Sequence, residues 1–262
     1  LSGRFLSQEF HQHAAINERW NNFTVTEEMG LRCDSFRVQG SLSGILHNSF
    51  KDNFASFFGL EYFSPMGTLF ISHSRAVTFP TALDKVYERQ TLRAEKTYQT
   101  QIGIRSRILN KKGEFSLCTF QKDLSDLLQW DSSIQKVYNV DKAKIQGVEA
   151  EFTYNFNKKS SIFINYTYLS AYNKTNSTRL IGRPRHKATL GLEKSFLENF
   201  QWGILLSFRR NIINIDPENA TNTTPGDNYF VANTHLSYFW KENLKLSLRC
   251  ENLFNKHYQS VK

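Results

Sequence analysis

Two pairs of residues have the spacing of catalytic or metal-binding groups. Glu149 and Glu151 lie two positions apart, as do His11 and His13, and residues two apart in a strand point to the same face. Paired carboxylates can serve a glycosidase as acid and nucleophile, and two imidazoles can bind zinc. No third metal ligand accompanies the histidines, and an ordinary polar strand face accounts for both pairs. We therefore expect no catalytic centre, metal site or cofactor.

Basic residues cluster in Arg183-Pro184-Arg185-His186-Lys187 and in Phe208-Arg209-Arg210, and Lys plus Arg outnumber Asp plus Glu by 33 to 24. Such clusters could follow a nucleic-acid backbone. They stand at predicted strand ends beside long loops, where an anionic lipopolysaccharide or an anionic small molecule is the better partner. We expect no nucleic-acid partner, and we expect Lys187 or Arg185 to pair with the two glutamates.

The three cysteines, Cys33, Cys118 and Cys250, lie far apart without CxxC spacing. This spacing supports neither a zinc site nor a disulfide framework. We expect free thiols that act as small packing residues.

Alternating apolar and polar residues predict strands that position these side chains. The even positions from Val148 to Phe156 are apolar and the odd ones are small or polar, which is the period of a strand with one apolar face. No stretch approaches the ~18 apolar residues of a membrane-spanning helix. The chain is expected to form about twelve strands in all, and the alternation is visible in segments near 8–18, 22–36, 53–63, 67–76, 93–108, 114–127, 145–156, 162–168, 187–193, 202–209 and 244–249.

The connections between these strands alternate in length. Short turns are predicted at 19–22, 64–67, 110–113, 157–160, 195–199 and 240–243, and long polar loops at 37–52, 77–92, 128–138, 170–184 and 211–228. Outer-membrane barrels have short turns on one side and long loops on the other, with aromatic girdles at the interfaces. The fold class predicted is all-β, an antiparallel transmembrane β-barrel. The aromatic residues expected at its girdles are Tyr166, Tyr168, Tyr172, Trp202, Tyr229, Tyr238 and Trp240.

Several motifs resemble those of TonB-dependent outer-membrane receptors, in that family's order. Residues 139–151 read NVDKAKIQGVEAE and are followed by NYTYL at 165–169, RPRH at 183–186 and NLFNKHY at 252–258. Upstream stand GLRCD at 30–34, SHSRA at 72–76 and LRAE at 92–95. The residues that carry the resemblance are Gly30, Arg32, Asp34, Arg75, Glu95, Gly147, Glu149, Asn165, Tyr166, Arg183, Pro184, Asn252, Leu253, Phe254, Asn255 and Tyr258.

The resemblance implies a 22-stranded barrel, of which the chain would supply about twelve strands. Residues 1–262 are expected to form part of that barrel, with the plug domain and the last strand outside it. A self-contained twelve-stranded barrel is the alternative.

The resemblance also implies a function that is not enzymatic. Receptors of this family import a scarce nutrient across the outer membrane of a Gram-negative bacterium, most often a ferric siderophore and less often cobalamin, haem or a glycan. The implied partners are outer-membrane lipid and lipopolysaccharide, TonB through the N-terminal region of the full-length protein, and a small-molecule ligand. A passive porin and a soluble all-β binding module are the alternatives. Arginines near predicted loop ends are candidates for attracting an anionic chelate, namely Arg75, Arg89, Arg179 and Arg183.

Overall fold

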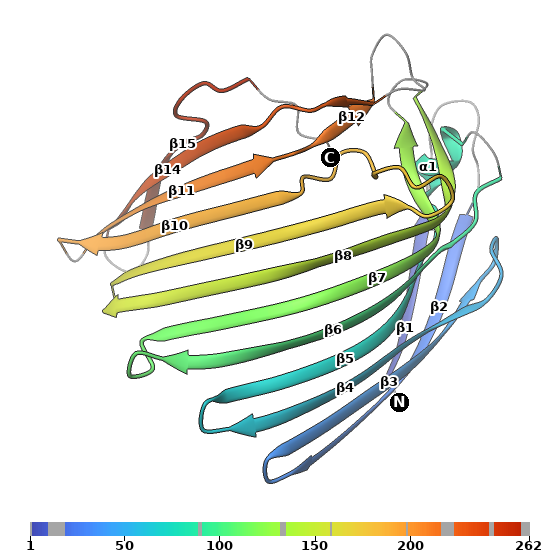
Figure 1. The fold of residues 1–262 in the computed structure, drawn as a ribbon, viewed down its shortest axis with the longest axis horizontal. Helices are drawn as coiled ribbons and strands as arrows, with labels where there is room; N and C mark the ends of the chain where they lie inside the picture. The colour runs from blue at the N-terminus through green and yellow to red at the C-terminus, as the bar shows by residue number, and fades with distance from the viewer. Residues whose placement is uncertain are drawn as a thin grey trace.

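The computed structural model describes residues 2–9, 19–88, 91–131, 135–157, 159–197, 199–215, 223–240 and 244–257. Thirteen strands form one sheet in chain order, each antiparallel to its neighbours (Figure 1). The all-β prediction is confirmed, with one strand more than expected. The strands are β1 (Ser2–Glu9), β2 (Arg19–Cys33), β3 (Phe36–His47), β4 (Asn53–Ser64), β5 (Gly67–Thr78), β6 (Glu95–Ile108), β7 (Gly113–Asp131), β8 (Lys136–Asn157), β9 (Ser160–Asn173), β10 (His186–Phe196), β11 (Phe200–Arg210), β14 (Tyr229–Trp240) and β15 (Leu244–Cys250).

The sheet curls into an open wall. Figure 1 shows β1 and β2 receding behind β3 to β5, and among the described residues β1 pairs only with β2 and β15 only with β14. Two loops contain further elements, the helix α1 (Ala82–Val86) and the small hairpin of β12 (Ile213–Ile215) and β13 (Thr223–Pro225). No described helix has the length and apolar character needed to cross a membrane.

One face of the sheet carries an apolar surface, because strand alternation and register place apolar residues side by side. The row that passes through Tyr166 consists of Leu69, Ile104, Leu117, Ala150, Tyr166, Ala188, Phe208 and Phe230. We call this the outer face, and the apolar residues on it the apolar belt. On β11 the belt covers nine residues, from Phe200 to Phe208, close to the ~9–11 with which a tilted strand crosses a bilayer.

The opposite, inner face carries charged and polar residues as well as some apolar ones, and two of its glycines lie beneath aromatic rings. A Cβ atom at Gly147 would lie 2.9 Å from the ring of Phe120 and would also collide with the Tyr168 carbonyl. At Gly191 it would collide with the ring of Phe163. Covering a strand glycine with a cross-strand ring is a recognised way of pinning strand register.

Connections of different length lie at opposite ends of the sheet, as predicted (Figure 1). Short links join β2 to β3, β4 to β5, β6 to β7, β8 to β9, β10 to β11 and β14 to β15. The expected long loops near 77–92, 170–184 and 211–228 are confirmed at 79–94, 174–185 and 211–228. We call their end of the sheet the loop end.

Several local predictions were wrong. The expected loop at 37–52 is mostly strand β3, and the expected turn at 19–22 lies inside β2. The expected loop at 128–138 is largely replaced by the extended ends of β7 and β8. Most of the expected strand 8–18, including His11 and His13, lies outside the described residues. Tyr229, expected in a girdle, is registered with the inward Arg209 and faces inward, whereas the other six aromatic residues face outward.

Candidate functional site

A row of charged and polar side chains crosses the inner face at mid-height. Glu149, Thr167, Lys187 and Arg209 occupy registered positions on four neighbouring strands. With Glu151, which lies on the same face, they line a hollow of about 240 Å³. Both signs of charge therefore face one polar space, as expected for a wall that borders water rather than lipid.

Of the two basic residues expected near the glutamates, Lys187 lines this hollow and Arg185 does not. Arg185 donates from Nη2 to Tyr172 Oη at 3.1 Å, and Tyr172 lies on the outer face. Asn165, another motif residue, lines the same hollow as Glu149. Among the described residues no group of three potential metal ligands occurs.

A second inner cluster lies near the short turns. The Glu61 carboxylate, whose side chain is 16 % exposed, accepts from Arg37 at 3.3 Å and from Arg105 at 3.4 Å. The motif residue Arg32 stacks its guanidinium over the ring of Phe63 at 5.0 Å. These contacts connect β2, β3, β4 and β6 across the inner face. Asp34, from the same motif, occupies the turn that follows with a φ of 33°.

At the loop end, motif residues anchor the β5–β6 loop to the β7–β8 hairpin. Asn139, which is 6 % exposed, accepts from the Arg93 N–H at 2.8 Å and donates to the carbonyls of Arg93 at 3.0 Å and Asp126 at 2.7 Å. Glu95 accepts from the Leu128 N–H at 3.1 Å. We call Asn139 and these partners the loop anchor. It explains physically why the motifs at 92–95 and 139–151 contain these two residues.

Charged groups reinforce the loop anchor. The Arg93 guanidinium donates to Asp126 at 2.7 Å and to Asp141 at 2.8 Å, and the hydrogen bond with Asp126 is the main cause that raises the pKa of Arg93. Asp126 adopts a φ of 59°. Sequence reasoning did not single out Arg93, Asp126 or Asp141, because each is an ordinary charged residue until the hairpin brings them together.

The β9–β10 loop folds back over the inner face beside this anchor. The Leu180 N–H donates to the Ala171 carbonyl at 3.0 Å, and the Leu180 side chain is buried in a cluster with Phe120, Leu124 and Ile145. Arg183 lies in the same loop, where burial lowers its pKa and nearby Glu95 opposes that effect. Leu180 and Arg183 are thus placed where the loop covers the inner face.

The three candidate arginines that the structure describes have separate contacts. Arg75 is 8 % exposed; its guanidinium lies 3.8 Å from the centroid of the Phe54 ring and donates to Tyr98 Oη at 3.2 Å, on the outer side of the sheet. Arg179 donates to the Asn211 carbonyl at 2.8 Å. Arg183 lies near Glu95, as described above, and Arg89 lies outside the described residues. Their role in attracting an anion stays a prediction.

The remaining motif residues have local structural contacts. On the outer face, Tyr166 Oη lies 2.9 Å from Nδ1 of His186. Pro184 stands two positions before this histidine. Asn252 closes a turn by donating from Nδ2 to the Lys256 carbonyl at 3.0 Å and accepting from the Lys256 N–H at 2.9 Å.

The segment after β15 is also fixed by contacts with β14. The Leu253 N–H donates to the Ala232 carbonyl at 2.8 Å, and the Phe254 ring stacks on Phe230 with centroids 6.1 Å apart. Asn255 ends the turn with a φ of 48°. Of the other motif residues, Gly30 is an ordinary position of β2, and Tyr258 lies outside the described residues.

The cysteines are free thiols, as expected, but Cys33 and Cys250 are exposed and only Cys118 is half-buried, so the expected packing role does not hold for the first two. Cys118 is registered with Glu149 on the inner face. Their separation on different strands explains why no disulfide forms among them.

Comparisons with known proteins agree with this architecture. Residues 16–253 match the family described as "TonB dependent receptor-like, beta-barrel". A variant of the ferric enterobactin receptor PfeA from Pseudomonas aeruginosa superposes with a TM-score of 0.73 at 16 % identity, over 93 % of this chain and 41 % of that one. The ferripyoverdine receptor of the outer membrane of Pseudomonas aeruginosa gives 0.70 at 15 % identity, over 93 % and 36 %.

The copper transporter OprC gives a TM-score of 0.69 at 17 % identity, over 92 % of this chain and 43 % of that one. The chain therefore spans less than half the length of each of these three structures.

Proposed function

Since the chain belongs to the TonB-dependent receptor β-barrel family, we propose that it forms part of the barrel wall of a receptor for energy-coupled import of a scarce nutrient, with a ferric siderophore as the ligand. The family consists of transport receptors of the Gram-negative outer membrane rather than of enzymes. The specific ligand, the coupling to TonB and the transport activity itself are the proposed parts.

The two-faced sheet is the observation that carries the proposal. Its outer face presents the apolar belt, while its inner face presents Glu149, Lys187 and Arg209 to a common polar space. A wall of this kind separates lipid from an aqueous lumen through which a polar solute can pass. A soluble binding module would have to bury one of these faces in a core.

The siderophore assignment is supported by what the neighbouring structures are named for. Most of the solved structures reported as similar are siderophore receptors, for ferripyoverdine, ferric enterobactin or ferric catecholates, and one is a copper transporter. Ferric siderophores are commonly anionic, and the loop end of the sheet offers arginines to such a ligand. Arg179 and Arg183 are the two in the β9–β10 loop, where binding residues are commonly placed. Arg89 completes the proposed set, whereas Arg75 is buried against Phe54 and Tyr98 on the outer side of the sheet and is left out of it.

Energy coupling is proposed to reach the barrel through TonB and the N-terminal region of the full-length receptor. A strain that lacks the receptor should lose uptake of one ⁵⁵Fe-loaded siderophore from a panel, and the complemented strain should lose it again when the proton gradient is dissipated. Uptake that continues without the gradient would indicate a passive porin and would contradict the proposal.

The arginine proposal is tested in the same assay with the full-length receptor. The Arg179→Gln/Arg183→Gln variant should slow uptake about 10-fold, since charge steering changes association rates by at least that factor. Arg107→Gln is the control, because Arg107 is an exposed arginine near the end of β6 that lies away from the loop end. Unchanged uptake in the double variant would remove the arginines from the ligand path without affecting the transport proposal.

A further inference from the structure

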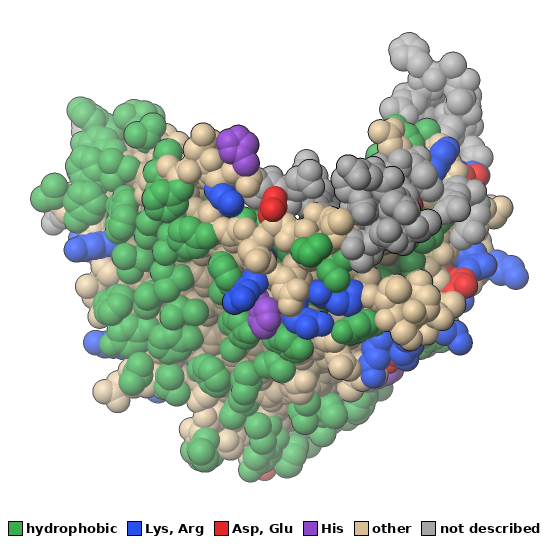
Figure 2. Space-filling view, turned by 45° about the horizontal axis from the view of Figure 1, so that its top comes forward, with side chains coloured by type: hydrophobic (Ala, Val, Ile, Leu, Met, Phe, Trp, Pro, Cys, Tyr) green, Lys and Arg blue, Asp and Glu red, His purple; other side chains and the backbone are tan. Residues whose placement is uncertain are grey.

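A histidine closes the β3–β4 loop, residues 48–52, at the loop end of the sheet. His47 is the last residue of β3 and lies one position beyond Leu46, the last apolar residue of that strand on the outer face. Figure 2 shows the hydrophobic surface giving way to polar and charged side chains towards the loop end. By strand alternation the His47 side chain shares the inner face with Arg37, so it lies on the aqueous side of the wall.

The ring of His47 holds the loop by hydrogen bonds and by stacking. Its Nδ1 accepts from the N–H groups of Ser49 at 3.0 Å and Phe50 at 3.3 Å. The His47 backbone N–H donates to Asp52 Oδ1 at 3.1 Å. The ring also meets Phe50 edge-on, with centroids 4.9 Å apart, and Phe79 at a tilt, with centroids 4.7 Å apart. Because Phe79 is the first residue of the β5–β6 loop, these contacts, which we call the His47 latch, join two loops.

The two bonds that Nδ1 accepts require one protonation state. Only a ring nitrogen without a proton can accept a hydrogen bond, so the closed latch contains a neutral ring with its proton on Nε2. A second proton would go to Nδ1 and point at two donors. Burial lowers the pKa of His47, and the charge of Asp52 opposes this effect. The closed latch is therefore fully favoured above the ordinary histidine pKa of ~6.5 and loses stability as the pH falls below it.

Among the described residues, Asp52 is the charged group that acts on the ring. Lys51, its neighbour in the loop, is exposed. On the β5–β6 loop, the Asp84 carboxylate accepts from the N-cap N–H of α1 at 2.7 Å. On β2, the residue registered with His47 is the uncharged Asn22. Of these groups, histidine is the one whose change of charge falls between pH 5 and 8.

We propose that His47 is a proton-sensitive latch, which holds the β3–β4 loop against the β5–β6 loop while its ring is neutral and releases it when the ring is protonated. Release separates the rings of Phe50 and Phe79, so the two loops move independently in acidic surroundings. The proposal does not depend on which nutrient the receptor imports.

The test is hydrogen–deuterium exchange of the full-length receptor in lipid bilayers at pH 7.5 and 5.5, with each rate divided by the intrinsic rate at that pH. Protection of the Ser49 and Phe50 amides should fall by up to about 10-fold at pH 5.5, because each pH unit below the ordinary pKa changes the ratio of the two histidine forms tenfold. His47→Asn should show no such fall, because an amide oxygen accepts hydrogen bonds without titrating in this range. Asp52→Asn, which retains the histidine, should keep the pH dependence.

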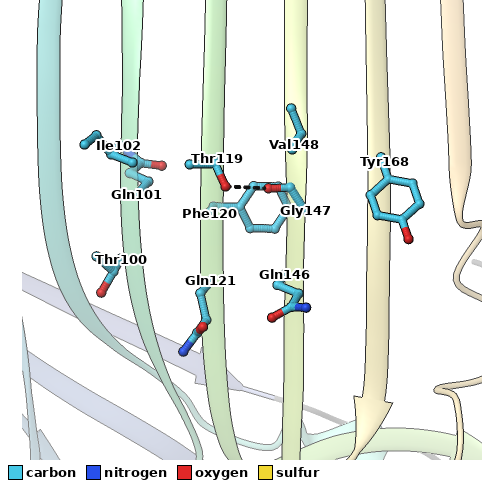
Figure 3. A pocket seen from close by; sticks show the side chains of 10 residues that line it. All are labelled: Thr100, Gln101, Ile102, Thr119, Phe120, Gln121, Gln146, Gly147, Val148 and Tyr168. Carbon is cyan, nitrogen blue, oxygen red and sulfur yellow. Dashed lines mark hydrogen bonds between the residues drawn. The ribbon is translucent and has the colours of Figure 1, made fainter.

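His73→Asn is the matched control, because His73 is a histidine of the outer face. Its Nδ1 lies 2.9 Å from Oγ1 of Thr100, and Figure 3 shows Thr100 in one row with Gln121 and Gln146. This variant should keep the pH dependence of the wild type.

Three results would overturn the proposal. They are equal or absent protection of the two amides at both pH values in the wild type, an unchanged pH dependence in His47→Asn, and loss of the pH dependence in Asp52→Asn or His73→Asn. Heat-dependent electrophoretic mobility of each variant shows that the barrel has folded, so a folding defect is not mistaken for a released loop.

Discussion

Removing the Asn139 side chain should release the β5–β6 loop without unfolding the sheet. Asn139 is 6 % exposed and makes three hydrogen bonds, two with the Arg93 backbone and one with the Asp126 carbonyl. At roughly 1 kcal/mol for each bond, Asn139→Ala should destabilise the loop anchor by about 3 kcal/mol. Since 1.4 kcal/mol is a factor of ten, local opening at Arg93 should increase about 100-fold.

Hydrogen–deuterium exchange of the reconstituted full-length receptor measures this opening directly. The amides of 92–95 should lose protection in Asn139→Ala, while those of the β8–β9 pair should not. Asn155→Ala is the control, since Asn155 is an exposed asparagine on the same strand. Asn139→Asp should also lower the protection of these amides, because a carboxylate cannot donate to the two carbonyls. Unchanged protection at 92–95 in Asn139→Ala would refute the assignment of these bonds as the anchor.

Three further substitutions test other parts of the wall. Gly147→Ala should destabilise the barrel by about 1–3 kcal/mol through overpacking, seen as a lower temperature of heat-modified mobility, whereas Gly44→Ala, with open space at its Cβ position, should not. Glu61→Gln should cost about 1 kcal/mol because its two arginines are partly exposed, and equal losses in low and high salt would argue against an ionic cause. Asn252→Gly keeps the left-handed backbone but loses the side-chain hydrogen bonds. It should therefore speed hydrogen exchange of the Lys256 amide about 10-fold. An unchanged exchange rate would show that backbone conformation alone holds the turn.

The alternation of apolar and polar residues predicted most of the sheet because, across the apolar belt, each strand has one apolar face and one polar face. It failed at β3, where Gly40, Ser41, Ser43 and Gly44 resemble a loop. These residues have low strand propensity, and β3 is held by pairing with a neighbour on each side. Tertiary pairing of this kind has no local signal.

The ends of β7 and β8 were missed for a related reason. Beyond the membrane the two-faced pattern stops, so the segment around Val137 looked like a loop. There the strand is held by the β5–β6 loop, whose Tyr87 carbonyl accepts from the Val137 N–H at 2.7 Å. The ring of Tyr87 also meets Trp130 edge-on, with centroids 5.4 Å apart.

Motif residues were found by resemblance, but their physical roles required the structure. Glu95 and Asn139 lie 44 positions apart in the sequence and meet only in the loop anchor. Arg183 and Arg185 belong to one basic cluster, yet Arg183 lies near Glu95 and Arg185 contacts Tyr172 on the outer face. Charge clusters in a sequence do not reveal which face each side chain takes once the chain leaves a regular strand.

The central claim is that one wall separates lipid on its outer face from water on its inner face. Spin labels placed one at a time at positions 148, 149, 150 and 151 of β8, in the receptor in lipid bilayers, test it most directly. The account predicts that labels at Val148 and Ala150 are relaxed mainly by oxygen, which dissolves in lipid, and labels at Glu149 and Glu151 mainly by a water-soluble nickel chelate. Equal accessibility to both reagents at all four positions would contradict it.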